Sequence, residues 1–294
     1  MKVLVTGANG FIGRYVCEQL ERDGHTALKL DKRAVDGEAV VGDVRDAADM
    51  RRCVSFCDAV IHLAGVLGTQ ECIQDPRPAV ETNILGGINM LEAVAEHKVP
   101  AVFCGIGNHW MNNTYSITKS TIERFVSMYN RERGTRINVV RPVNVYGPRQ
   151  VAPAPYGPSR VRKVVPSFVC RALCGDDIEI YGDGKHYSDL VYVEDAAKVF
   201  CEALYYPGQL GTIELGPEDH TSVIELAETI NALCGRQSKI VHLPMRPGED
   251  PDNVIANTAV LNRLVYWDFV PLSQGLKRTI AYFGDRILSR RHSA

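Results

Sequence analysis

The sequence lacks any stretch approaching the roughly 18 consecutive apolar residues that a membrane span requires. It also lacks an excess of charge of one sign: 33 Lys and Arg stand against 35 Asp and Glu, for a formal net charge of −2. This balance predicts binding to neither nucleic acid nor membranes, although it leaves room for a local basic site for a phosphorylated small molecule. The N-terminus enters an apolar run at Val3, without a signal peptide's regions before it, which predicts a cytoplasmic protein.

A paired CxxC framework is absent as well. The nine cysteines are an odd number spread from Cys17 to Cys234, which argues against a disulfide scaffold. Cys53 and Cys57, like Cys170 and Cys174, are four residues apart and could in principle meet a metal. Small buried apolar side chains are the simpler interpretation, and we expect no metal site.

The first half of the chain alternates short β-rich apolar runs with amphipathic segments, within a composition of 45% hydrophobic residues that allows a sizeable core. Because parallel strands need crossover connections, which are usually helical, this alternation predicts an α/β fold with a doubly wound parallel sheet. We expect strands at residues 3–6, 27–31, 39–42, 59–64, 101–104 and 137–141, and the clearest helices at 11–22, 78–97 and 115–133.

The sequence pattern changes after Gly147. Residues 152–158 are too proline-rich for a continuous helix and predict a loop. Helix and strand signals then return without a regular repeat, at residues 165–174, 178–181, 193–205, 222–234 and 273–283. We therefore expect residues 1–147 to form the sheet domain, with some later segments returning to it. Residues 148–294 would be mainly a smaller α/β substrate lobe.

A glycine motif, Gly7-Ala8-Asn9-Gly10-Phe11-Ile12-Gly13, lies between the first expected strand and the first expected helix. Such glycines allow a tight turn, let backbone amides approach a pyrophosphate and let helix and strand pack closely. The spacing is GxxGxxG rather than GxGxxG, and a glycine triplet alone can be a structural turn. The strand before it and the helix after it favour a dinucleotide site in a Rossmann-type domain.

Acidic residues after the next two strands complete this predicted site. Asp31 ends the second strand, where a carboxylate can bond the adenosine ribose and repel a 2′-phosphate, which favours NAD over NADP. Lys32 and Arg33 follow at once and could instead neutralise a 2′-phosphate. Asp43 is suited either to contact the adenine amine or to cap the helix after it.

Tyr115 and Lys119 are four residues apart in an expected helix, and hence on one face of it. A tyrosine pKa of about 10 makes a poor base at neutral pH, and lowering it to about 7 takes roughly 4 kcal/mol. A nearby lysine together with a cationic nicotinamide can supply that. Behind a dinucleotide motif, the pair predicts a catalytic tyrosine.

With these residues, the sequence resembles the extended short-chain dehydrogenase/reductase family, specifically its nucleotide-sugar epimerase and dehydratase branch. The resemblance covers nearly the whole chain. It is carried by residues 6–13, Gly42-Asp43-Val44, His62-Leu63-Ala64-Gly65, Thr82-Asn83, residues 115–119, 141–149, 181–184, 189–195 and 246–249.

The resemblance implies that Tyr115 is the acid/base on a sugar hydroxyl, and that Lys119 holds the nicotinamide ribose and lowers the tyrosine's pKa. It implies a homodimer joined through the helices near 78–97 and 115–133. It also implies a set of NAD-binding residues: Gly7, Asn9, Gly10, Phe11, Ile12, Gly13, Asp31, Lys32, Asp43, Val44, Leu63, Ala64, Gly65, Asn83, Tyr115, Lys119 and Pro142.

For the nucleoside diphosphate sugar, the resemblance implies that Asn144 contacts the sugar or diphosphate and that residues 164–166 line the base pocket. Arg246 would pair with phosphate, a task that suits its planar guanidinium. Arg149, Arg160, Arg162 and Lys163 around the proline-rich loop are further candidates. The expected substrate-binding set is Asn144, Arg149, Val164, Val165, Tyr181, Arg246 and Glu249.

Two positions depart from the family pattern. Residues 102–110 lack the Ser or Thr that usually follows the fifth strand, so Asn108, His109 or Thr114 would have to replace it. Ser188 stands where relatives commonly place an arginine for the diphosphate.

Residues 104–113 contain no Asp or Glu, which disfavours a dehydratase because elimination needs an added acid and base. The favoured function is an NAD-dependent epimerase acting at sugar C4 through a transient 4-keto intermediate. A dehydratase or ketoreductase of the same family stays open, as does a catalytically impaired NAD-binding regulatory protein.

Overall fold

A seven-stranded, wholly parallel sheet forms the centre of the computed structural model, which describes residues 1–32, 40–250, 252–264 and 268–291. The strand order is β10-β6-β5-β4-β1-β2-β3, so the order reverses beside β1 and places a crevice at the carboxyl ends of β1 and β4. The strands are β1 (Lys2–Thr6), β2 (Thr26–Asp31), β3 (Val40–Val41), β4 (Ala59–His62), β5 (Ala101–Cys104), β6 (Ile137–Pro142) and β10 (Thr212–Leu215).

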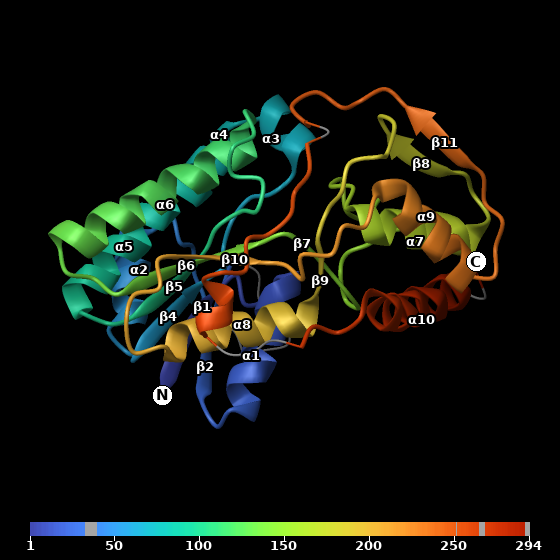
Figure 1. Ribbon diagram of the computed structural model, residues 1–294. Coiled ribbons are helices and arrows are strands. Elements are labelled where there is room, and N and C mark those ends of the chain that lie inside the picture. The colour runs from blue at the N-terminus through green and yellow to red at the C-terminus, as the bar shows by residue number, and fades with distance from the viewer. Residues whose placement is uncertain (33–39, 251, 265–267, 292–294) are drawn as a thin grey trace.

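Helices cover both faces of this sheet, which confirms the predicted doubly wound α/β architecture (Figure 1). On one face pack α2 (Ala47–Val54), α5 (Gly86–His97) and α6 (Thr114–Glu132). On the other pack α1 (Phe11–Arg22) and α8 (Val193–Tyr205). The central strands β1, β4 and β5 are buried on both sides, as β-rich apolar runs without alternation indicate.

The three helices predicted most clearly are present, but the second is interrupted. Residues 77–97 form α4 (Arg77–Ala79), a π-helical segment η1 (Val80–Leu85) and then α5. Short α3 (Thr69–Gln74) precedes them and was not predicted. Of the strand expected at residues 39–42, residue 39 lies outside the described part of the chain.

After residue 147 the chain both builds a second lobe and returns to the sheet. Strand β10, which was not predicted, pairs with β6, and α8 packs on α1. The lobe, at the right of Figure 1, has its own apolar core. It contains α7 (Val164–Cys174), β8 (Ile178–Tyr181), α9 (Val223–Leu233), β11 (Ile240–Leu243) and α10 (Leu272–Arg291), while η2 (Leu261–Arg263) lies against β10.

Two short parallel strands, β7 (Asn144–Tyr146) and β9 (Leu190–Tyr192), join the two parts of the molecule. Parallel β8 and β11 pair at the outer side of the lobe. Among the described helices, none is both long and apolar enough to cross a membrane.

Candidate active site

A single cavity of about 760 Å³ runs from the glycine turn after β1 to the C-terminal lobe. Its wall contains nearly all the residues predicted to bind NAD and all those predicted to bind substrate. Among the described residues, the predicted site residues that the wall does not include are Asn83, His109, Thr114, Lys119 and the further candidate Arg160.

The backbone of the glycine turn packs so tightly against itself and its neighbours that its glycines leave no room for a side chain. Gly7 has φ +70°, in the left-handed region, and its carbonyl accepts the amide of Gly10 at 2.9 Å. A Cβ on Gly13 would lie 2.2 Å from the Gly7 oxygen. No side chain caps the first turn of α1, so its amides are available to a pyrophosphate, and the residues present fit a dinucleotide.

Asp31 holds this turn, because its Oδ2 accepts the Asn9 amide at 3.1 Å. Asp43 also lines the cavity, where its carboxylate accepts the Arg45 guanidinium at 2.7 and 2.9 Å. This hydrogen bonding lowers the pKa of Asp43. The alternative helix-capping role for Asp43 was wrong, since Asp46 caps α2 by accepting the amides of residues 48 and 49. Lys32 lines the cavity too, and Arg33 is outside the described residues.

Lys119 lies just behind the wall, with only 3% of its surface exposed. Its Nζ is 4.5 Å from the centre of the Phe103 ring, and a Cβ on Gly65 would lie 3.8 Å from it. Burial lowers the pKa of Lys119. Burial first, and then the Lys119 charge, lowers the pKa of His62 to about 3, so that ring is neutral.

Tyr115 is on the first turn of α6 and faces the cavity. Burial raises the pKa of its phenol above the ordinary value of 10, and the thiols of Cys104 and Cys72 raise it further. Lys119 is not among the groups that shift this pKa, so the lowering expected from it is not found in the protein without a dinucleotide. Any lowering of the Tyr115 pKa is therefore expected mainly from the cationic nicotinamide.

Cys104 at the end of β5 lines the cavity, as do Ile106, Asn108 and Met111 of the loop after it. Asn108 donates to the Met111 sulfur at 3.0 Å. Among the predicted replacements for the missing hydroxyl, only Asn108 lines the wall. The sequence did not single out Cys104 or Met111, because neither type is common in a sugar site.

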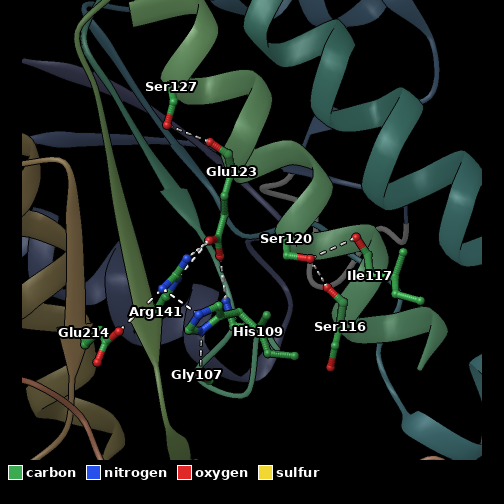
Figure 2. Close-up of polar contacts among 10 residues, drawn as sticks. Gly107, His109, Ser116, Ile117, Ser120, Glu123, Ser127, Arg141 and Glu214 are labelled. Carbon is green, nitrogen blue, oxygen red and sulfur yellow. Dashed lines mark hydrogen bonds and ion pairs between the residues drawn. The ribbon is translucent and has the colours of Figure 1, made fainter. Parts of the chain in front are cut away.

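His109 is engaged elsewhere (Figure 2). Its ring lies 3.2 Å from the Gly107 carbonyl oxygen and 3.3 Å from Nη1 of Arg141. Arg141 bonds Glu123 at 2.5 and 2.8 Å and approaches Glu214 at 3.5 Å. Glu123 in turn accepts the Ile106 amide at 3.3 Å, so this ion-pair network supports the loop from behind.

Asn83 has a similar supporting role. Its side chain accepts the Val66 amide at 2.8 Å and donates to the Val66 carbonyl and to Thr118 Oγ1, both at 3.0 Å. It therefore fixes the loop after β4 to α6 rather than facing the cavity.

Basic residues gather at the far end of the cavity. Ser188 accepts a hydrogen bond from Asn144, so its small side chain is already engaged. Arg246 stacks on Tyr181, 4.5 Å from the ring centre, and Nε bonds Glu249 at 2.9 Å.

Lys163 faces the same space. Burial lowers its pKa, with Glu249 raising and Arg246 lowering it, so the three groups are neighbours. Within the described part of the chain, no carboxylate forms an ion pair with Lys163. The Nδ1 atom of His186 is buried without a hydrogen-bond partner among the described residues, and His186 also lines the cavity.

The three remaining arginine candidates differ from Lys163. Arg149 lines the cavity, but its guanidinium pairs with Glu18 and lies 5.0 Å from the centre of the Tyr15 ring. Arg160 is exposed and is not in the wall. Arg162 lines the wall and is bonded to the Tyr181 hydroxyl at 2.8 Å.

A family model described as "NAD dependent epimerase/dehydratase family" matches residues 3–215. The chain therefore belongs to this family of enzymes, within the extended short-chain dehydrogenase/reductases, and NAD is its cofactor.

Among curated relatives, a UDP-N-acetyl-alpha-D-glucosaminuronate decarboxylase of Bacillus cytotoxicus is 29% identical over 97% of this chain and 98% of its own. Two solved structures are similar over nearly their whole length. One is a UDP-glucose 4-epimerase of Thermotoga maritima with UDP-glucose (28% identity, TM-score 0.88, covering 98% of this chain and 100% of that one). The other is a UDP-glucose 4-epimerase of Thermus thermophilus with NAD (27%, 0.84, 96% and 99%).

Proposed function

We propose that the protein is an NAD-dependent 4-epimerase of a nucleoside diphosphate sugar. The observation that carries this proposal is the single cavity, which joins the dinucleotide turn, the Tyr115 phenol and the basic end around Arg246. The similar epimerases named above support it. A dehydratase is less favoured, because residues 104–113 contain no Asp or Glu to serve as the added acid and base that elimination needs.

Tyr115 takes the proton of the C4 hydroxyl and later returns it. Lys119 supplies positive charge behind the wall, which stabilises negative charge on the phenol oxygen. Bound NAD supplies a reversible hydride acceptor beside the sugar. The wall between Ile106, Met111 and Val143 is apolar, so it makes few hydrogen bonds that would keep a 4-keto sugar from turning over.

Asn108 takes the position of the missing hydroxyl. Its amide already lines the cavity, and its present partner is a thioether sulfur, which is a weak acceptor. Exchanging that partner for a sugar oxygen therefore costs little. Thr114 and His109 have no part in the proposal.

The experiment is to add the purified protein to UDP-, GDP- and dTDP-sugars, with and without NAD, and to follow sugar NMR signals. We expect inversion at C4 without net NADH. Loss of the C6 hydroxyl would instead indicate a dehydratase, and stoichiometric NADH release a dehydrogenase.

Tyr115→Phe should lower turnover about a thousandfold while NAD still binds, because only the proton acceptor is lost. Tyr129→Phe is the matched control: this tyrosine is on the same helix, bonds Glu92 and is outside the cavity wall. Equal activity of the two variants would exclude Tyr115 as the proton acceptor.

The diphosphate is held by Arg246 and Lys163, with Lys163 supplying the charge that Ser188 cannot. Lys163→Gln should therefore weaken UDP binding about tenfold, the loss of one charge-assisted hydrogen bond. Titration calorimetry measures this against Arg160→Gln, an exposed neighbour outside the wall. Equal affinities of both variants would remove Lys163 from the site.

A second copy of the chain covers the outer face of η1 and α6. Val80, Leu85 and Ile117 are large apolar side chains exposed there, with Leu85 at 51%. Leu85→Glu should convert a dimer to a monomer in sedimentation equilibrium, because it buries charge at the interface. Phe56→Glu, 69% exposed beyond the end of α2, should not. A wild-type monomer would contradict this assignment.

A further inference from the structure

The segment at residues 244–250, called the strap below, spans the two sides of the cavity. It follows β11 in the C-terminal lobe and runs across the top of Figure 1 to α3. On the lobe side, Arg246 stacks on Tyr181, and the Met245 methyl lies 2.6 Å from the position that a Cβ on Gly182 would occupy. These contacts fix the strap to the lobe at Arg246, the residue proposed to bind phosphate.

The other anchor of the strap is on the sheet domain. Gly248 has φ +72°, and a Cβ added to it would lie 2.4 Å from Ile73 of α3 and 3.3 Å from the Cβ of Asn113. Gln70 donates to the Pro247 carbonyl, and Asn113 Nδ2 donates to the Gly248 carbonyl at 3.0 Å. Only a backbone without a side chain can approach α3 and α6 this closely.

Asn113 is also the N-cap of the helix that carries Tyr115. Its Oδ1 accepts the Ser116 amide at 3.0 Å, and its carbonyl accepts the Ile117 amide at 2.9 Å. The residue is 2% exposed, so both halves of one buried amide are committed. One half fixes the first turn of α6, and the other fixes the strap.

We propose that Asn113 is a positioning residue, which couples nucleotide binding at the strap to the placement of Tyr115. This inference rests on the proposed function. Arg246 and Glu249, which are bonded to each other, lie on either side of Gly248, so a diphosphate bound there restrains the carbonyl that Asn113 grips. Binding energy from the nonreacting nucleotide is thereby used to orient the catalytic phenol.

The chain allows this coupling to be cut without removing the helix cap. In Asn113→Ser the hydroxyl still accepts the Ser116 amide, since serine is an equally good N-cap, but it is too short to reach Gly248. Gln70→Ala is the matched control, because it removes the neighbouring bond to the strap and leaves Asn113 intact. Thermal unfolding checks that both variants are folded.

Hydrogen exchange with UDP as the probe reads the coupling without turnover. In the wild type and in Gln70→Ala, UDP should slow exchange both in the strap and at residues 115–118. In Asn113→Ser the strap should still respond, and the response of α6 should fall at least about fivefold. An unchanged α6 response in Asn113→Ser overturns the inference, as does a wild type in which the strap alone responds. If UDP slows neither segment, the proposed nucleotide site fails and the inference fails with it.

Turnover of the sugar found by the NMR panel gives a second readout. Asn113→Ser should lower kcat about tenfold with KM within about twofold, because the lost interaction orients the reacting group. A rise in KM with kcat unchanged would show that Asn113 serves binding alone, and would overturn the coupling.

Discussion

The positive charge of Lys119, buried at the end of the parallel sheet, is the constraint around which the site is arranged. No carboxylate in the described part of the chain forms an ion pair with it. Its Nζ lies 4.5 Å from the centre of the Phe103 ring, and Cys104 and Glu123 act on its pKa from nearby. A buried cation without a partner is costly, so it favours negative charge developing nearby. The same charge helps keep His62 neutral under the cavity. Tyr115 lies one turn before Lys119 on the same helix and lines the cavity, so it is the group that we propose to take up negative charge when substrate binds.

The cavity is completed by segments that are distant in sequence. Glycines after β1 form one end, while Lys163 and Arg246 from the C-terminal lobe form the other. Two kinds of support hold the middle: the Glu123–Arg141 ion pair behind the β5 loop, and the strap that Asn113 fastens to α6. Fixed spacing between these parts is what an enzyme needs to hold a reacting carbon beside both a base and a cofactor.

Local signals predicted much of this from sequence. Helix α1 and the glycine turn before it were identified because glycine spacing and helical periodicity are short-range patterns. Tyr115 and Lys119 followed from a spacing of four. The features that the sequence did not predict depend on distant partners. Strand β10 is recognisable only by its pairing with β6, and the His109 ring lies against Arg141 instead of lining the cavity. The capping role offered for Asp43 belongs to Asp46, and the link between Asn113 and Gly248 spans 135 positions.

The central claim is that the Tyr115 phenol becomes a usable base only when the dinucleotide adds its positive charge to that of Lys119. Its most direct test is the pKa of Tyr115, measured by ultraviolet difference absorbance between wild type and Tyr115→Phe, with and without bound NAD. The account predicts a pKa above 10 in the protein alone, as burial dictates, and a value lower by more than about one unit with NAD bound. An identical pKa in both states would contradict it.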